Sequence, residues 1–216
     1  MARKTKQQAE ITRQEIIDAA IKTFSERGVS TTSLADIAKA AGVTRGAIYW
    51  HFKNKADLFY QACEFSDSQI LLAERNYRLK YINDPLSSLR ELLIYILTEF
   101  IDNPKNRALM EIFFHKCEMV GEMAAVVDFK RENYMASHSR IVDQLQLCID
   151  AGQLPANLNV ECASIMVHSM ISGILENWLF QPESFNIYQH TVTLVDSLIE
   201  MMRSSPSIRR QPAPSE

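Results

Sequence analysis

Glycine is scarce in this sequence, and long apolar runs are missing. Six of 216 residues are glycine, whereas 47% are hydrophobic and 23% are charged. This composition, with many Leu, Ile, Ala and Glu residues, favours helices over strands. The longest uncharged stretch of the second half, residues 162–175, is shorter than the roughly 20 residues that span a bilayer. We therefore expect a globular, all-α protein with no membrane segment.

Cysteines are few and far apart. Cys63, Cys117, Cys148 and Cys162 contain no CxxC pair, so a disulfide framework is not indicated and free thiols are favoured. The N-terminal segment MARKTKQQ is basic but is not followed by an apolar region, which argues against a secretory signal. We expect a cytoplasmic protein.

Catalytic and cofactor-binding patterns are also lacking. His115 and Cys117 lie two residues apart, a spacing that does not share a helix face. Ser169 has no nucleophile-elbow sequence around it, and no glycine-rich phosphate loop occurs. We therefore expect no enzyme activity, no metal ion and no cofactor.

The charges are unevenly distributed along the chain. Residues 1–55 contain ten Lys and Arg but five Asp and Glu, a net charge of +5. Residues 56–216 contain 13 basic and 21 acidic residues, a net charge of −8, and the whole chain carries −3. The basic N-terminal segment suits a polyanion and the acidic remainder does not.

Three short helices are predicted in the N-terminal quarter. Apolar residues recur with helical spacing from Ile17 to Phe24, and Gly28 is well placed to end that helix. A second helix of seven or eight residues stops at Gly42, and a third follows to about His51. Two such helices joined by a short Gly-containing turn are typical of a helix-turn-helix.

Helix starts are marked by capping residues. Ser33 and Asp36 form a capping-box pattern with Asp in place of Glu, and Thr44 can cap the third helix. Asn54 repeats the pattern and opens a long fourth helix that can run to about Lys80. Further helical periodicity covers residues 86–101, 106–119, 122–151, 158–180 and 187–203. The sequence predicts eight to ten helices.

Four ring-bearing side chains follow one another from Tyr49 to Phe52. Successive helical residues point about 100° apart, so one helix cannot bury all four. We expect Phe52 and Ile48 to face the core. The other three rings then stay near the surface beside Arg45, where their N–H and O–H donors suit a phosphate-binding rim.

Residues 31–59, TTSLADIAKAAGVTRGAIYWHFKNKADLF, resemble the DNA-binding helix-turn-helix of the TetR family of transcriptional repressors. The segments FFHKCEMVGEM at 113–123 and ISGILENWLF at 171–180 are similar to the AcrR-type repressors of multidrug efflux pumps. The resemblance covers most of the chain.

The resemblance implies DNA-contacting roles for eight residues. Base contacts are expected from Arg45 and Gly46, and phosphate contacts from Ser33, Thr44, Tyr49, Trp50, His51 and Lys55. Two alternatives stay open, since Trp50 can partly roof the first and fourth helices and His51 can be a structural hydrogen-bonding residue.

Soft apolar residues and a few acids occur along the later helices. Flexible Met side chains and Phe rings make an interior that can adapt to varied ligands, and an acid facing it would attract lipophilic cations. The resemblance favours a pocket contacted by Cys63, Asp67, Ile70, Phe100, Met110, Glu111, Phe114, Met166 and Met170. Ordinary core, or a solvated face for the acids, is the alternative for each residue alone.

The last two predicted helices are apolar on more than one side, which indicates a second surface to be covered. A two-fold dimer through a four-helix bundle would cover it. The expected interface residues are Ile171, Ile174, Leu175, Trp178, Val195, Leu198 and Met202.

The expected organisation is a helix-turn-helix domain at 10–55, a helical ligand-binding and dimerisation domain at 56–205, and a disordered tail at 206–216. The resemblance implies a homodimeric repressor that binds the palindromic operator of a multidrug efflux operon and is released by drug-like, often cationic or aromatic ligands. A TetR-type regulator of another operon that senses a metabolite, and a DNA-binding protein with no sensor, are the alternatives.

Overall fold

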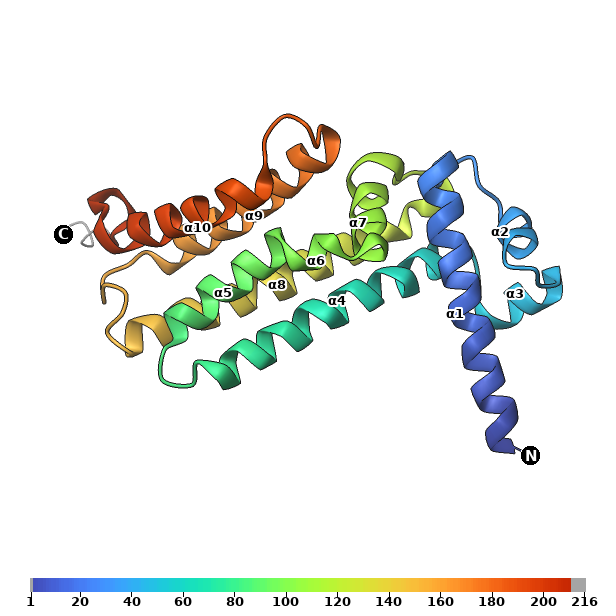
Figure 1. The fold of residues 1–216 in the computed structure, drawn as a ribbon, viewed down its shortest axis with the longest axis horizontal. Helices are drawn as coiled ribbons and strands as arrows, with labels where there is room; N and C mark the ends of the chain where they lie inside the picture. The colour runs from blue at the N-terminus through green and yellow to red at the C-terminus, as the bar shows by residue number, and fades with distance from the viewer. Residues whose placement is uncertain (1, 211–216) are drawn as a thin grey trace, which may run out of the picture. The chain divides into compact units, whose positions relative to one another are not determined.

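The computed structural model describes residues 2–210, and their side chains from residue 6 onwards. Its regular structure is helical (Figure 1). The α-helices are α1 (Ala2–Arg27), α2 (Leu34–Ala40), α3 (Arg45–His51), α4 (Lys55–Lys80), α5 (Pro85–Leu97), α6 (Glu99–Asp102), α7 (Pro104–Glu111), α8 (Ala125–Asp150), α9 (Val160–Phe180) and α10 (Ile187–Ser204). Shorter turns are η1 (Ile112–Lys116), η2 (Gly121–Met123) and η3 (Pro206–Ile208). The predicted all-α class is confirmed.

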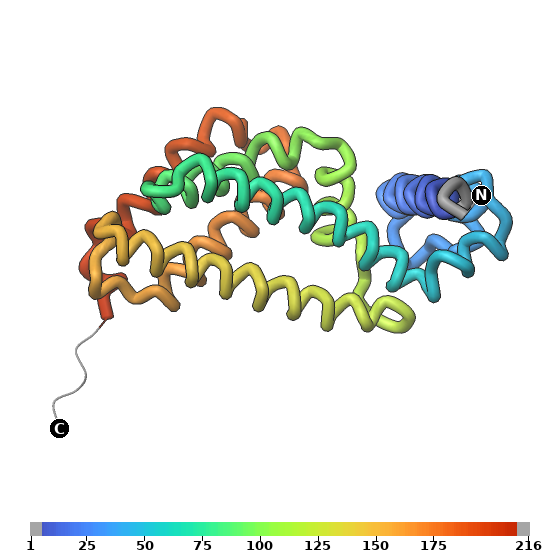
Figure 2. The backbone as a smooth tube through the Cα atoms, turned by 90° about the horizontal axis from the view of Figure 1, so that it is seen from below, coloured from blue at the N-terminus to red at the C-terminus, as the bar shows by residue number. Residues whose placement is uncertain are grey.

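The chain divides into two compact units. The first consists of Met1–Gln69 and Asp102–Arg131, and the second of Ile70–Ile101 and Glu132–Glu216. The long helices α4 and α8, teal and yellow in Figure 2, therefore contribute residues to both units. The helix-turn-helix thus shares its unit with the segment around α7, which a boundary at residue 55 does not anticipate.

The core of the first unit contains three phenylalanines. Phe24, Phe52 and Phe59 are each 1% exposed or less, and the rings of Phe24 and Phe59 meet edge to face with centroids 6.2 Å apart. Apolar residues from α7 and the segment after it, including Ile112 and Met123, join the same core. This shared core fixes the helix-turn-helix against the other helices of the first unit.

The predicted turns and caps of the helix-turn-helix are confirmed. Gly28 and Gly42 have φ of 82° and 68°, a left-handed conformation that costs side-chain-bearing residues free energy and that glycine adopts readily. Ser33 and Asp36 form the capping box of α2, and the Thr44 side chain caps α3. Local sequence therefore sets these helix ends.

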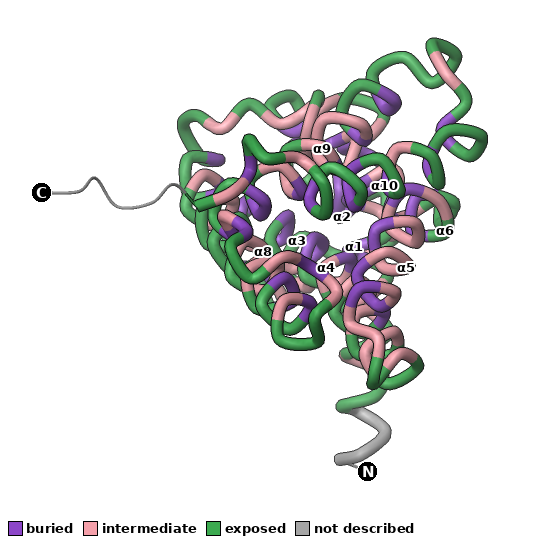
Figure 3. The backbone as a smooth tube through the Cα atoms, turned by 90° about the vertical axis from the view of Figure 1, so that its left-hand side faces the viewer, coloured by how far each residue is buried: buried purple, intermediate pink, exposed green. Residues whose placement is uncertain are grey.

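In the second unit, α5 packs against α9 and α10. Buried positions recur along each helix with exposed positions between them (Figure 3), as expected for amphipathic helices. An ion pair joins two of these helices at the surface, where Arg90 Nε and Nη2 donate to the two carboxylate oxygens of Asp196 at 2.6 and 3.0 Å. None of the described helices is both long and apolar enough to cross a membrane.

The structure corrects the prediction of disorder from residue 206. Pro206–Ile208 forms a 3-10 turn, and the Ile208 side chain is 4% exposed. The Asn159 N–H donates to the Ile208 carbonyl at 2.9 Å, and the Arg210 N–H donates to the Asn157 carbonyl at 2.8 Å. One buried isoleucine anchors a segment whose Pro- and Ser-rich composition predicts disorder. Residues 211–216 lie outside the described part.

Candidate nucleic-acid interface

Two buried side chains fix the orientation of α3. Ile48 is 0% exposed and Phe52 is 1% exposed, which confirms the expected core positions. The Thr44 Oγ1 accepts a hydrogen bond from the Ala47 N–H at 3.2 Å at the start of the helix. With one face held in the core, the opposite face of α3 is turned outwards.

The outward face of α3 carries a cation, a glycine and two large rings. Arg45 and Gly46 are exposed, Tyr49 is 50% exposed and Trp50 is 73% exposed. The Arg45 guanidinium carbon lies 5.9 Å from the Tyr49 ring centroid, consistent with their i, i+4 spacing. The alternative of Trp50 as a core residue is wrong, because most of its side chain is exposed.

His51 lies at the edge of this face. Its side chain is half-buried, and its ring meets the Trp50 ring edge to face at 4.5 Å. Burial, and then the charge of Arg13, lower the pKa of His51 below its usual 6.5. The imidazole is therefore largely neutral at pH 7, so it can donate one N–H but supplies no positive charge.

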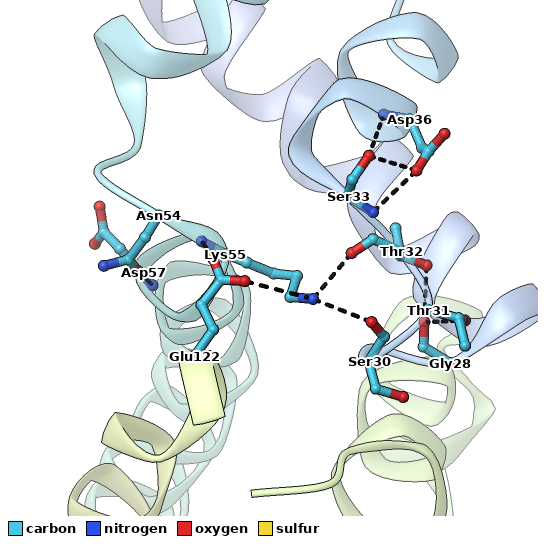
Figure 4. A network of polar contacts seen from close by, with 10 residues as sticks. All are labelled: Gly28, Ser30, Thr31, Thr32, Ser33, Asp36, Asn54, Lys55, Asp57 and Glu122. Carbon is cyan, nitrogen blue, oxygen red and sulfur yellow. Dashed lines mark hydrogen bonds and ion pairs between the residues drawn. The ribbon is translucent and has the colours of Figure 1, made fainter. Parts of the chain in front are cut away.

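Ser33 lies at the start of α2, where its hydroxyl is already used. Its Oγ donates to the Asp36 carboxylate at 2.5 Å and accepts the Asp36 N–H at 3.2 Å (Figure 4). The hydrogen bonds that this carboxylate accepts from the Ser33 hydroxyl and from the Ser33 backbone N–H lower the pKa of Asp36, so it is ionised at pH 7. The phosphate contact expected of Ser33 stays a prediction, and it would form beside a negative charge.

The structure corrects the prediction for Lys55. Lys55 is 7% exposed, and its Nζ donates to the Thr32 carbonyl at 3.0 Å and the Ser30 carbonyl at 3.5 Å (Figure 4). The Glu122 carboxylate lies 3.7 Å from the same Nζ. The first turn of α4 directs the ammonium group at the loop between α1 and α2, so it is enclosed by protein and not presented to a phosphate.

The neighbouring Lys53 is exposed instead. It lies between α3 and α4, and its backbone N–H donates to the Asp57 carboxylate at 2.8 Å. Helical periodicity does not apply between two helices, so the sequence cannot decide which of Lys53 and Lys55 faces outwards. The hydrogen bonds at the start of α4 turn the Lys55 side chain inwards and leave Lys53 exposed.

In the first unit, the expected ligand-contacting residues differ in burial. Cys63 is 8% exposed and belongs to the core, where burial raises the pKa of its thiol. Asp67, Met110, Glu111 and Phe114 are half-buried. The Glu111 carboxylate lies 3.4 Å from the Lys116 ammonium and 3.7 Å from the Arg107 guanidinium.

In the second unit, Phe100 is 1% exposed and its ring lies 6.4 Å from that of Tyr95. Ile70, Met166 and Met170 are half-buried. A ligand contact for each of the expected residues stays a prediction. A separate surface cleft of about 470 Å³ in the second unit is lined mainly by polar and charged residues, and the expected ligand-contacting residues do not line it.

The structure corrects six of the seven residues expected at the dimer interface. These six are 8% exposed or less and pack within their own chain, whereas Ile174 is half-buried and its place in an interface stays a prediction. Helical periodicity identifies an apolar face but not what covers it, and here α5 lies against both helices. The exposed apolar residues of α9 and α10 are Ile165, Phe180, Tyr188, Val192 and Met201, all at least 41% exposed.

Comparison with known proteins places this geometry in a family. The model for bacterial regulatory proteins of the tetR family matches residues 16–62. The model for the C-terminal region of MAATS-type transcriptional repressors matches residues 84–204. The chain is 51% identical to the HTH-type transcriptional regulator AcrR of Shigella flexneri over 216 residues, which is 100% of each chain.

Solved structures agree with these matches. NalD, the secondary repressor of the MexAB-OprM multidrug efflux pump in Pseudomonas aeruginosa, is 30% identical with a TM-score of 0.77, over 92% of this chain and 99% of that one. SmeT, the repressor of the Stenotrophomonas maltophilia pump SmeDEF, in its triclosan complex is 25% identical with a TM-score of 0.81, over 95% and 100%. The chain therefore belongs to the TetR family of bacterial transcriptional repressors.

Proposed function

We propose that this protein represses a multidrug efflux operon by binding its palindromic operator as a homodimer, and that a drug-like ligand releases it. The observation that carries the proposal is the outward face of α3, with Arg45, Gly46, Tyr49 and Trp50 exposed against a buried Ile48. The similarity to AcrR and to the efflux-pump repressors NalD and SmeT supports the choice of operon.

In the proposed complex, α3 lies in the major groove. Arg45 can donate two hydrogen bonds to a guanine, and Gly46 lets the helix backbone approach a base edge. Thr44, Tyr49, Trp50 and His51 contact phosphates, which fix the register of the helix on the duplex. The exposed Lys53 takes the phosphate-binding place that the sequence assigns to the buried Lys55.

A palindromic operator requires two copies of α3 related by two-fold symmetry. The exposed Tyr188 and Val192 are four residues apart on α10 and share a face, and this apolar face is one that a second copy would cover. Helix-turn-helix dimers read half-sites about one DNA turn apart, ~34–36 Å, or multiples of that distance.

The ligand is proposed to be lipophilic, often cationic or aromatic. Met110 and Phe114 offer adaptable apolar surface, and the half-buried Glu111 offers a negative charge. Lys116 and Arg107 already hold that carboxylate, so a cationic ligand must compete with both. The triclosan complex of SmeT makes triclosan a suitable first probe.

The test is the affinity for a duplex that the protein itself selects from a random pool, measured with and without saturating triclosan or a cationic dye. A coupling of the size typical of allosteric proteins would weaken DNA binding about 5- to 150-fold. Equal affinities in the presence of bound ligand would contradict ligand-controlled release.

A further inference from the structure

We infer that Glu122 is a positioning residue for DNA binding. It holds Lys55, and Lys55 holds the loop Gly28–Ser33 that leads into α2. We call Glu122, Lys55 and Lys116 the lysine clamp. The inference rests on the proposed function, because it concerns how the DNA-reading helices are kept in place.

The first contact of the clamp is the buried ammonium of Lys55. Its Nζ donates to the carbonyls of Thr32 and Ser30, and the Lys55 side chain is 8% exposed (Figure 4). Thr32 is itself 2% exposed and its hydroxyl donates to the Gly28 carbonyl at 2.7 Å. The loop is therefore held from inside the unit just before the N-cap of α2.

Glu122 contacts Lys55 twice. One carboxylate oxygen accepts the Lys55 backbone N–H at 3.3 Å, and the other lies 3.7 Å from Nζ. The carboxylate thus meets the first N–H of the 26-residue helix α4, where the helix dipole favours negative charge. It also supplies the countercharge that a buried ammonium needs.

A second lysine holds the end of α1 and the start of the same loop. Lys116 Nζ donates to the Ser25 carbonyl at 2.9 Å, and its backbone carbonyl accepts the Val29 N–H at 3.0 Å. Lys116 ends the π-helical turn η1, a rare geometry that is frequent at functional sites. The segment from Lys116 to Glu122 therefore contacts the α1–α2 loop directly at Lys116 and through Lys55.

Because Glu122 is negatively charged, the direction in which its removal changes the DNA affinity tests its role. Removing an acid brings the protein closer to a polyanion-binding charge balance, so electrostatics alone predicts equal or tighter DNA binding. Loss of positioning predicts weaker binding. The two explanations therefore move the affinity in opposite directions.

The experiment compares Glu122→Gln with Glu118→Gln. Glu118 is exposed in the same segment, so both variants lose one negative charge. For a duplex selected by the wild-type protein, Glu122→Gln is expected to weaken binding at least about 5-fold, the lower end of typical coupling between sites. Glu118→Gln is expected to leave binding unchanged or slightly tighter. Equal affinities for the two variants would overturn the inference.

Hydrogen exchange of the free protein gives a readout that does not need DNA. Amides of the segment 29–33 are expected to exchange faster in Glu122→Gln than in Glu118→Gln, and equal rates would overturn the clamp. If the wild-type protein selects no duplex, the proposed function fails while exchange still decides on the clamp. Glu122→Asp is the second variant if Glu122→Gln does not fold, because its side chain is shorter but keeps the charge. It is also expected to speed the exchange of residues 29–33 and to weaken DNA binding.

Discussion

At the residue scale, the outward face of α3 is set by which side chains are buried. Ile48 and Phe52 occupy the core, so Arg45, Tyr49 and Trp50 are directed outwards. A helix has one rotational setting once two of its side chains are fixed in a packed core. The burial of two apolar residues therefore positions three polar or aromatic ones.

Arg45→Ala is expected to weaken binding of the selected duplex by about 1–3 kcal/mol and to relax specificity at one base position. The reason is that a bidentate contact to a base edge is lost. Competition with single-base variants of the duplex measures this loss of specificity. Arg27→Ala removes one positive charge from an exposed residue of α1. It should weaken binding to all duplex sequences by the same factor. A uniform loss for Arg45→Ala as well would count against a base contact.

Substitution of Gly42 or Gly46 by alanine is expected to change the stability of the fold in opposite directions. Gly42 has φ of 68°, and a Cβ added there would meet no atom within 4 Å. Gly42→Ala should therefore lower the free energy of unfolding by about 1–2 kcal/mol through the backbone alone. Gly46 is helical, with its nearest neighbour 3.9 Å from the position of a Cβ, so Gly46→Ala should raise stability by about 0.4–1 kcal/mol. Urea unfolding measures both.

The same Gly46→Ala variant should bind the selected duplex more weakly despite its greater stability, because the added methyl group separates the helix from the base edge. Anisotropy titration of the duplex tests this. Undiminished binding would show that the backbone at Gly46 does not approach DNA closely.

Sequence reasoning at this scale succeeds where helical periodicity applies. The spacing within α3 correctly separates Ile48 and Phe52 from the exposed residues. It fails at Lys55, because the side chain lies at a helix start and its direction depends on carbonyls of Ser30 and Thr32, more than 20 residues away.

At the element scale, helix starts follow local chemistry and helix interruptions do not. Ser33, Thr44 and Asn159 cap their helices through their own side chains, and the first two are predictable from sequence. The predicted helix 106–119 instead ends its α-helical part at Glu111 and continues as a π turn to Lys116. That change accompanies the burial of Ile112 and the bonds of Lys116 to α1, which are contacts between distant segments.

The ion pair between α5 and α10 should contribute a small, pH-dependent stability. The hydrogen bond from Arg90, more than its charge, lowers the pKa of Asp196. A carboxyl group with a lowered pKa stabilises the fold above its ordinary pKa, about 3.9, and this contribution is lost as the pH falls through the folded-state value. Arg90→Gln should therefore cost about 0.2–1 kcal/mol near pH 7, since the pair is partly exposed.

Urea unfolding at pH 7 and near pH 3 checks this prediction, and the difference from the wild-type protein should shrink at the lower pH. Arg131→Gln is the matched control, because Arg131 and Asp128 are each 73% exposed and should contribute almost nothing. A difference that stays constant with pH would exclude the pairing with Asp196 as its cause.

At the scale of the whole molecule, the compact units divide the chain differently from its apolar pattern. The first unit takes residues 102–131 together with the helix-turn-helix, an association between distant segments that no local pattern contains. The expected dimer interface is wrong at six of its seven residues for a related reason. Apolar spacing on α9 and α10 predicts which faces are buried, and most of the residues named from it are buried by their own protomer.

The proposed dimer surface predicts two different mutant phenotypes. Val192→Glu puts a charge on the exposed face of α10 that Val192 shares with Tyr188 and should yield folded monomers in sedimentation velocity. Leu198→Ala, at a position 2% exposed, should destabilise the protomer by about 2–5 kcal/mol without specifically dissociating the dimer. A dimeric Val192→Glu protein would place the interface elsewhere.

Selection of duplexes from a random pool tests the central claim most directly. The wild-type protein is expected to enrich a palindromic sequence whose half-sites lie about one DNA turn apart, ~34–36 Å, or a multiple of it. The Arg45→Ala protein is expected to lose the preference at one position of each half-site. Enrichment of no sequence by the wild-type protein would contradict its assignment as an operator-binding repressor.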